Sequence, residues 1–389
     1  MGLAPIDREE DRLAEQTETH LGTATIGVTV PSNKVRQIGS VSMNIRTLSC
    51  GSCYACGAKG EALYRELRDR LCEVPGVWKF KRCTNDDCGI LWLDPKPIAE
   101  DLPLAYRTYF THQNPEARIP IGDKLRPRIM NFVRSGYLSR KYGYFQGSCT
   151  ALQNWAGLGV FLDPLRRADL DASVIYLPQQ NGGRLLDVGC GAGETLRTMR
   201  NLGWEVEGLD PDPLVVQRGK ALGLPVQSGS LRECSYGPNR FDAITMVHVV
   251  EHLPDPLIDL QQAYRLLKKG GLLVMTTPNV SSLGHRFFRS NWIHLDPPRH
   301  LHIFASRPLT ALTERAGLRV EKLFTTVRWA AYAFAHSMLI RWRGISSIHA
   351  ATPRLLYALA KSLAFVEWAL LTPQPLLGEE IVLVARKDY

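Results

Sequence analysis

The order of apolar and polar residues predicts strands and helices in turn over the second half of the chain. From Gly183 onward, short apolar runs alternate with segments whose apolar residues recur at helical spacing, which is typical of a parallel, doubly wound sheet. Helices are expected in the gaps, for example at 213–222 and 257–267, the second ended by Lys-Lys-Gly-Gly. The predicted strands are 184–188, 205–209, 225–227, 241–247, 271–276, 318–325 and 381–385.

The first predicted strand leads into a turn with glycines at alternate positions, Gly189, Gly191 and Gly193. Glycine lacks a Cβ, so the backbone of such a turn can approach a ligand closely. The helix that follows offers free N–H donors and the positive end of its dipole. By itself the turn fits either a nucleotide site or a tight strand-to-helix connection, and its spacing differs from the Gly-x-Gly-x-x-Gly of dinucleotide sites.

Polar residues follow the later strands at the same edge of the predicted sheet, where ligands of open parallel sheets bind. Asp210 ends the second strand, roughly twenty residues past the glycines, where a carboxylate can accept hydrogen bonds from a ribose diol. Ser230 and Leu231 follow the third strand, and His248 follows the fourth. We therefore expect these side chains to lie near the glycine turn.

A dense group of cysteines precedes the predicted sheet. Cys53 with Cys56, and Cys83 with Cys88, form two closely spaced pairs, each followed by glycine, with the spacing of zinc knuckles. These four thiolates predict a structural zinc site with no open position for water. Cys50 could replace Cys56 as a ligand or take no part, and buried free thiols without a metal are the alternative.

Composition and charge exclude few classes of protein or partner. The chain has 389 residues, of which 45% are hydrophobic and 22% charged, so it is globular with two units or one elaborated domain. A net charge of +9 permits contact with phosphates or an anionic membrane, although a basic soluble protein explains it equally well. The N-terminus shows no secretory signal pattern, so the nine cysteines favour thiols or a metal site and a cytoplasmic location.

A long apolar insertion, 329–372, separates the last two predicted strands and exceeds a hairpin loop. Its second apolar run contains Lys361 and Glu367, which disfavours a bilayer span. Helices lying on the inner membrane face and a helical hairpin packed on the bridge or in a dimer explain it equally well. The expected segments are a flexible leader at 1–45, a zinc-binding module at 46–98, a helical bridge or lid at 99–180 and the sheet domain at 181–389.

The ordered motifs resemble those of class I S-adenosylmethionine-dependent methyltransferases over about 183–327 and 378–386. The cysteine pairs, with Pro-Pro-Arg-His-Leu-His-Ile-Phe at 297–304, resemble a bacterial subgroup that has an N-terminal zinc-binding segment and often modifies sugars or cell-envelope glycans. The resemblance implies an α/β fold: a doubly wound, seven-stranded Rossmann-like sheet with a small zinc-knuckle module and a helical insertion before the last strand. The matching motifs are Leu185-Leu-Asp-Val-Gly-Cys-Gly-Ala-Gly, Asp210, 241–256 and 266–279.

The resemblance also implies a role for each matched residue. Asp187 would orient the glycine loop or the amino group of S-adenosylmethionine, and the three glycines would contact its methionine part and ribose. Asp210 would hold the ribose hydroxyls, and His248 would face the sulfonium methyl. Ser230 and Leu231 would lie near the adenine edge, although many relatives have an acidic residue where this chain has Ser-Gly-Ser. In the bridge, Tyr109 and His112 either line a substrate pocket or pack within a lid.

We therefore expect O-methylation of a small-molecule or lipid-linked acceptor, foremost a sugar or glycan hydroxyl. Methyl transfer depends on alignment, and a histidine suits removal of the acceptor proton near neutral pH. His300 is the favoured base and His248 the second, while simple packing of the loop is the alternative. An RNA methyltransferase is disfavoured because the zinc segment lacks a stacking platform, and a non-catalytic cofactor-binding protein is the third reading. The histidines considered are His248, His252, His294, His300 and His302.

Overall fold

The structure is a computed structural model that describes residues 45–107, 125–144, 150–346 and 352–388. These residues belong to one compact unit, Met43–Tyr389. The predicted leader, apart from its last residue, and the candidate pocket residues Tyr109 and His112 lie outside the described residues.

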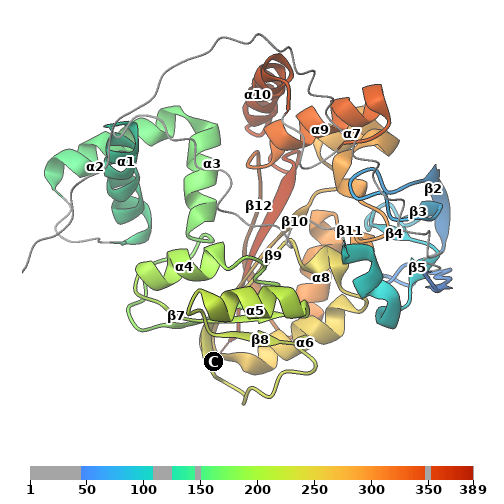
Figure 1. Cartoon of the computed structure of the whole chain (residues 1–389), viewed down its shortest axis with the longest axis horizontal. Coiled ribbons are helices and arrows are strands. Elements are labelled where there is room, and N and C mark those ends of the chain that lie inside the picture. Colours follow the sequence, from blue (N-terminus) through green and yellow to red (C-terminus); the bar gives the residue numbers. More distant parts are fainter. Residues whose placement is uncertain (1–44, 108–124, 145–149, 347–351, 389) are drawn as a thin grey trace, which may run out of the picture. The chain divides into compact units, whose positions relative to one another are not determined.

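A seven-stranded sheet forms the centre of this unit, in the order β12-β13-β10-β9-β6-β7-β8 (Figure 1). Strands β6 to β10 run parallel, and β13 is antiparallel to both of its neighbours. All seven predicted strands are confirmed; buried parallel strands such as β6 and β9 read as apolar runs in the sequence. Their bounds are β6 Arg184–Val188, β7 Glu205–Asp210, β8 Val226–Ser228, β9 Phe241–Val247, β10 Leu267–Pro278, β12 Arg319–Thr326 and β13 Glu380–Arg386.

Helices between these strands pack on the sheet. Asp212 and Asp255 begin α5 and α6, because each side chain accepts a backbone N–H of the first turn and a proline follows at once. Helices α6 and α8 contact each other, and both contact strands of the sheet. The bounds are α4 Glu194–Asn201, α5 Pro213–Ala221, α6 Pro256–Leu266 and α8 Ser306–Arg315.

A second, four-stranded sheet has the order β11-β4-β3-β2. Its strands β2 Gly60–Leu67, β3 Trp78–Cys83 and β4 Leu91–Leu93 come from the predicted zinc-binding module, whereas β11 His302–Ile303 comes from the loop after β10. The predicted module therefore shares a sheet with the sheet domain. A two-stranded sheet of β1 Thr47–Leu48 and β5 Lys96–Pro97, then the 3-10 helix η1 Ala99–Tyr106, complete this region.

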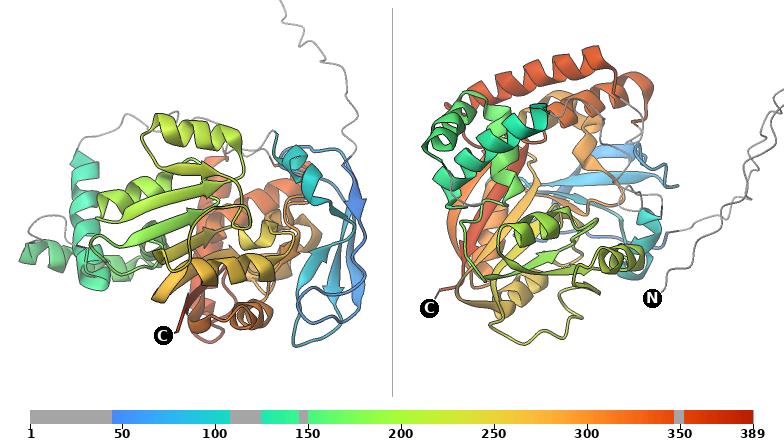
Figure 2. Two further views of the ribbon diagram at one scale, coloured as in Figure 1. Left: turned by 90° about the horizontal axis from the view of Figure 1, so that it is seen from below. Right: turned by 60° about the vertical axis from the view of Figure 1, so that its left-hand side comes forward.

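The bridge and the insertion are helical, as the sequence predicts. The bridge contains α1 Leu125–Tyr142, α2 Ala151–Leu158, the 3-10 helix η4 Gly159–Leu162 and α3 Pro164–Ser173. In the insertion, α9 Ala330–Arg343 pairs with α10 Arg354–Leu370, and α10 also contacts α3 (Figure 2). The α9–α10 pair thus packs on the bridge, which is the helical-hairpin arrangement that the sequence allowed. Within the described ranges, no helix is long and apolar enough to cross a membrane.

Candidate functional site

The glycine turn follows β6 directly and is built on left-handed backbone. Gly189, Gly191 and Gly193 have φ values of +67°, +50° and +76°, which residues with a Cβ rarely adopt. A Cβ on Gly189 would lie 2.6 Å from Cγ2 of Val249, which follows β9. The segment after β9 therefore lies directly against the turn, and glycine is required there both for conformation and for space.

Asp210, at the end of β7, is hydrogen-bonded to this turn. Its Oδ2 accepts the backbone N–H of Gly191 at 3.0 Å, and its Oδ1 accepts that of Asp212 at 3.0 Å. These bonds fix the orientation of the buried carboxylate. The structure thus brings Asp210 into contact with the glycine turn. The sequence predicts that these two features bind different parts of the same ligand.

Asp187 lies in β6, just before the turn, and is 3% exposed. Its Oδ1 accepts a hydrogen bond from the Thr245 hydroxyl at 2.7 Å. Burial raises the pKa of Asp187 to about 7; the hydrogen bond from Thr245 opposes this shift and the charge of Asp210 adds to it. A neighbouring ammonium group would therefore stabilise the ionised form of this carboxyl.

Ser230 and Leu231 follow β8, and they face different surroundings. The backbone N–H and the hydroxyl of Ser230 donate to Oε2 of Glu233 at 3.0 and 2.9 Å. These bonds lower the pKa of Glu233. Glu233 comes three residues after Ser230, and its carboxylate is hydrogen-bonded to that serine. Leu231 is buried in the core with 2% of its surface exposed. The predicted adenine contacts of both residues remain a prediction.

His248 lies at the end of β9 between two buried carboxylates. Its Nδ1 is 3.1 Å from Oε1 of Glu251, and its Nε2 is 2.9 Å from Oε1 of Glu380. Burial lowers the pKa of His248, but the two glutamates outweigh this effect and raise it to about 9. The ring is therefore an imidazolium at neutral pH. Because an imidazolium has no lone pair, this charge state argues against the predicted role of His248 as a base.

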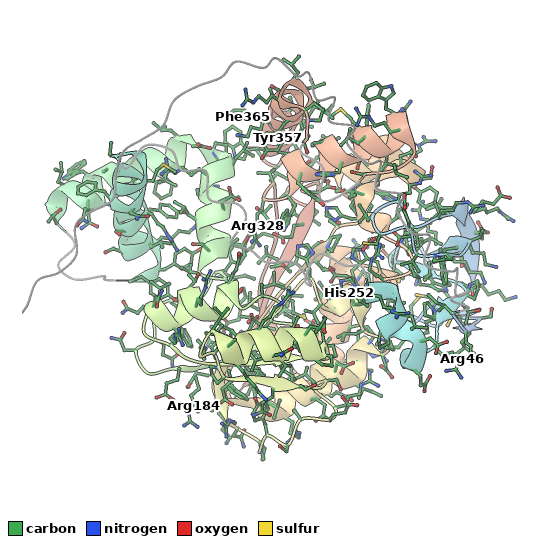
Figure 3. All side chains as sticks on the ribbon, in the orientation of Figure 1. Arg46, Arg184, His252, Arg328, Tyr357 and Phe365 are labelled. Atoms are coloured by element: carbon green, nitrogen blue, oxygen red, sulfur yellow. The ribbon has the colours of Figure 1, made fainter. Side chains whose placement is uncertain are left out.

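His300, in the loop after β10, is 5% exposed and lies beside His252. The two ring centroids are 4.6 Å apart with the planes steeply tilted, and the His252 label in Figure 3 marks the place. Burial lowers the pKa of His252 to about 4, so its ring is neutral near pH 7. One metal-binding atom each from Glu251, His252 and His300 lies within 4.8 Å of the others. From the sequence, His252 is only one of the histidines considered, and Glu251 has no assigned role.

The loop that carries His300 is anchored by a fully buried arginine, Arg299. Its guanidinium donates to the two carboxylate oxygens of Asp69 at 2.8 and 2.7 Å, and to Asp296 at 3.0 Å. It also donates to the backbone carbonyl of Ala105 at 3.2 Å. Because Asp69 follows β2, this network ties the loop after β10 to the N-terminal module. No local pattern in the sequence indicates this pairing.

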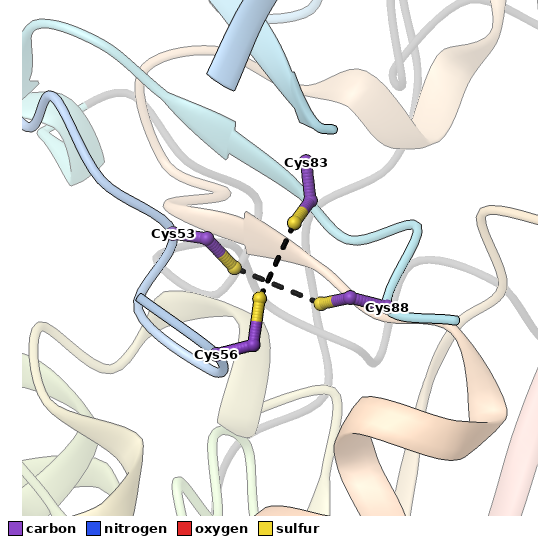
Figure 4. A group of neighbouring side chains, drawn as sticks. All are labelled: Cys53, Cys56, Cys83 and Cys88. Carbon is purple, nitrogen blue, oxygen red and sulfur yellow. Dashed lines mark hydrogen bonds between the residues drawn. The ribbon is translucent and has the colours of Figure 1, made fainter. Parts of the chain in front are cut away.

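The two cysteine pairs converge into a single group, shown in Figure 4. The Sγ atoms of Cys53 and Cys88 are 3.7 Å apart, and those of Cys56 and Cys83 are 3.4 Å apart. Sulfur atoms around a tetrahedral zinc with bonds of about 2.3 Å lie about 3.8 Å apart. The donor set therefore fits one zinc ion, with the four predicted residues as ligands. Cys50 lies outside this group of four.

The family model and curated relatives that this chain matches are described as methyltransferases. Residues 163–323 match a family model described as a methyltransferase domain. The ubiquinone biosynthesis O-methyltransferase of Xanthomonas campestris pv. campestris is 38% identical over 125 residues, which are 30% of this chain and 51% of the relative. The chain thus spans about half the length of that relative. A Cereibacter sphaeroides protein of the same name is 34% identical over 170 residues, 40% of this chain and 68% of the relative.

Solved structures of methyltransferases also resemble the chain. An S-adenosylmethionine-dependent methyltransferase from Mesorhizobium loti is 18% identical with a TM-score of 0.40, and covers 56% of this chain and 97% of its own. One from Archaeoglobus fulgidus is 22% identical with a TM-score of 0.39, and covers 59% of this chain and 99% of its own.

Proposed function

The chain belongs to the class I S-adenosylmethionine-dependent methyltransferases, and we propose that it methylates an oxygen atom of a small-molecule acceptor. The observation that carries this proposal is the hydrogen bond from Gly191 N–H to Asp210, 3.0 Å long. This bond joins the glycine turn, whose backbone a ligand can approach closely, to the carboxylate of Asp210, which can accept hydrogen bonds from a ribose diol. Oxygen as the methylated atom is supported by the relatives, which are named O-methyltransferases.

The residues around the turn fit S-adenosylmethionine, which supplies an electrophilic methyl group when bound. In this proposal the three glycines contact its methionine part and ribose, and Asp210 accepts the ribose hydroxyls. Asp187, whose pKa lies near 7, orients the loop or the amino group, which would keep this carboxyl ionised. Ser230 and Leu231 take the adenine side. Glycine is required at position 189 because a Cβ there would clash with Val249, so the backbone shape of the turn depends on it.

The acceptor side is assigned to His300. Its Nδ1 lies 2.7 Å from the carbonyl oxygen of His294, which can only accept a hydrogen bond, so Nδ1 carries the proton. In the neutral ring, Nε2 of His300 is then the nitrogen that can accept the proton of the acceptor, whereas two glutamates raise the pKa of His248 to about 9. His248 instead places a positive charge at the end of β9.

The acceptor itself is proposed to be a sugar or glycan hydroxyl, carried on a lipid. The support is the exposed apolar surface of the α9–α10 pair, where Trp342 is 74% and Leu355 is 88% exposed. Tyr357 and Phe365, labelled in Figure 3, continue this surface on α10. Arg343 lies over the ring of Trp342, so cations accompany the apolar side chains as they do in helices on anionic membranes.

The proposal is tested by calorimetry of S-adenosylmethionine binding. Asp210→Ala should weaken binding at least roughly tenfold, because hydrogen bonds to a charged group are lost. Glu207→Gln is the matched control: Glu207 lies on the same strand but pairs with Arg240, and affinity should not change. Transfer of labelled methyl groups to extract fractions, with products resolved as methyl ethers, tests the reaction. Unchanged affinity in Asp210→Ala, or products methylated only on nitrogen, would contradict the proposal.

A further inference from the structure

We propose that Glu380, Arg328 and Trp329 form a subsite that binds a second hydroxyl of the acceptor, and that the acceptor is a neutral ring with several hydroxyl groups. Glu380 begins β13, and Arg328, labelled in Figure 3, and Trp329 follow β12. Glu380 is hydrogen-bonded to His248, and Val249, the next residue, lies against the glycine turn. The inference rests on the proposed function, because it concerns the acceptor of that same reaction.

Glu380 is 1% exposed, and its two carboxylate oxygens differ in their contacts. Oε1 lies 2.9 Å from Nε2 of His248. Oε2 is buried and has no hydrogen-bond partner in the described part of the chain. A buried carboxylate oxygen that lacks a hydrogen bond is costly, because it has lost its hydration without replacement. A hydroxyl group of a bound molecule can donate the missing hydrogen bond.

Two donor atoms near this carboxylate are also buried and lack a hydrogen-bond partner among the described residues. Nη1 of Arg328 is 3.9 Å from Oε1 of Glu380, which is close enough for an ion pair but too far for a hydrogen bond. The second donor is Nε1 of Trp329, whose ring lies 5.8 Å from that of His248 and nearly perpendicular to it. The guanidinium of Arg328 lies 5.1 Å from the centre of the Trp329 ring, so the two donor groups are neighbours.

The sheet places a hydroxyl on the same face as Glu380. Thr276 of β10 pairs with Val382 of β13, two residues from Glu380, so Thr276 and Glu380 are diagonal neighbours. Oγ1 of Thr276 is buried, and within the described ranges it has no hydrogen-bond partner. The backbone carbonyl of Thr276 accepts the N–H of His248 at 2.9 Å. Because buried polar groups are nearly always hydrogen-bonded, several exceptions around one histidine point to a ligand.

The charges around the subsite favour a neutral ligand. His248 and Arg328 are positive, and Glu380 and Glu251 are negative. Burial raises the pKa of Asp169, and the charges of Arg328 and Glu380 act on it in opposite directions. An anionic acceptor would therefore meet no excess of positive charge. A hydroxyl group both donates and accepts, so a ring with several hydroxyls matches a site that offers a carboxylate oxygen beside two N–H donors.

The subsite is connected to the proposed base through Glu251. Oε1 of Glu251 lies 3.1 Å from Nδ1 of His248, and a carboxylate oxygen of Glu251 lies within 4.8 Å of a ring nitrogen of His300. In this arrangement one hydroxyl gives its proton to Nε2 of His300. Its oxygen forms the new bond to the methyl carbon, while the sulfur–methyl bond breaks and its electron pair stays on sulfur. Glu380 meanwhile holds a second hydroxyl of the same ring.

Saturation-transfer NMR on the full-length protein, loaded with S-adenosylhomocysteine, tests the subsite without turnover. The probes are neutral methyl pyranosides, methyl glycosides of uronic acids and catechols, titrated separately. We expect the neutral glycosides to bind most tightly. Trp329→Phe, which removes the indole N–H but keeps an aromatic ring, should weaken their binding about 3- to 10-fold. Glu380→Gln should weaken it roughly tenfold or more, because hydrogen bonds to charged groups are stronger.

Monodeoxy analogues of the glycosides distinguish a direct contact from a structural effect. In the wild type, loss of the hydroxyl that Glu380 binds should weaken binding, whereas in Glu380→Gln the same loss should have little effect. Trp155→Phe is the matched control: Trp155 lies on α2 and is 72% exposed, so glycoside affinity should not change.

Three results would overturn the inference: tighter binding of the uronic acid glycosides or the catechols, no glycoside binding by the loaded protein, or equal deoxy effects in the wild type and Glu380→Gln. Affinity for S-adenosylhomocysteine, measured on the same samples, should be the same in all variants. A wild-type protein that fails to bind S-adenosylhomocysteine would contradict the proposed function itself, which is a different result from loss of glycoside binding alone.

Discussion

Replacement of Arg299 by methionine tests the anchor that holds the loop with His300. Methionine retains much of the length of the side chain but removes its charge and all of its hydrogen bonds. Arg299 is fully buried, and its partners Asp69 and Asp296 are only 5% and 6% exposed. The substitution therefore leaves two buried carboxylates without the guanidinium that compensates their charge.

The expected cost follows from this geometry. Breaking a buried ion pair by removal of one partner destabilises a protein by about 3–5 kcal/mol, because an uncompensated charge stays behind. Arg299 compensates two such charges, so we expect the upper part of this range. The loss is a large share of the roughly 5–15 kcal/mol by which native proteins are stable.

The cost should depend on pH in a defined direction. Burial raises the pKa of Asp296, but the charge of Arg299 outweighs it and holds the pKa below its usual value. Such a lowered pKa contributes stability above the unfolded-state pKa of about 3.9, and this stability is lost as the pH falls through the folded-state value. In Arg299→Met the carboxyl of Asp296 takes up its proton at higher pH, because the charge that lowered its pKa is gone. The difference between the two proteins should therefore be largest near pH 7 and shrink toward pH 4.

Urea denaturation followed by circular dichroism at pH 7 and pH 4 measures both effects. Arg307→Met is the control, because Arg307 and its partner Asp87 are 75% and 82% exposed and such pairs contribute about 0–1 kcal/mol. Adding Asp69→Asn to Arg299→Met should recover part of the loss, since one buried charge is then removed. A loss below about 1 kcal/mol at pH 7, or a loss equal at both pH values, would refute the reasoning.

Two further predictions concern the four-cysteine group and the apolar face of α10. Cys83→Ser should lower the zinc content of the four-cysteine group, measured by elemental analysis, while Cys50→Ser should not; zinc retained in Cys83→Ser would contradict the four-thiolate assignment. Phe365→Glu should reduce co-sedimentation with anionic liposomes, because it puts a negative charge on the exposed apolar face of α10, whereas Phe365→Leu should not. An intact chain that never sediments would exclude the membrane contact.

The sheet could be predicted from the sequence because its signals are local. Each buried strand appears as a short apolar run, and the ends of β6 and β9 agree with the prediction. β10 begins at Leu267, earlier than predicted, because the Lys-Lys-Gly-Gly segment that resembles a helix stop is part of the strand. The glycine turn, Asp210 and the four cysteines were recognisable by spacing, since each group lies close together in the chain.

The rest of the site depends on partners far away in the sequence. His248 owes its charge partly to Glu380, which lies 132 residues later, and Arg299 meets Asp69 across 230 residues. Apolar periodicity reports which face of an element is buried, but it does not report which polar groups meet there. For the same reason the sequence pointed to individual histidines and not to the cluster of Glu251, His252 and His300.

The pairing of β11 with β4 has a consequence for synthesis of the protein on the ribosome. His302 pairs with Trp92, so the ribosome must add roughly two hundred residues after β4 before β11 can reach it, a delay of about 10–40 s at ~5–20 residues per second. During this time the edge of β4 is open to pairing with other chains. The nascent N-terminal module is therefore a predicted client for chaperones until the loop after β10 emerges.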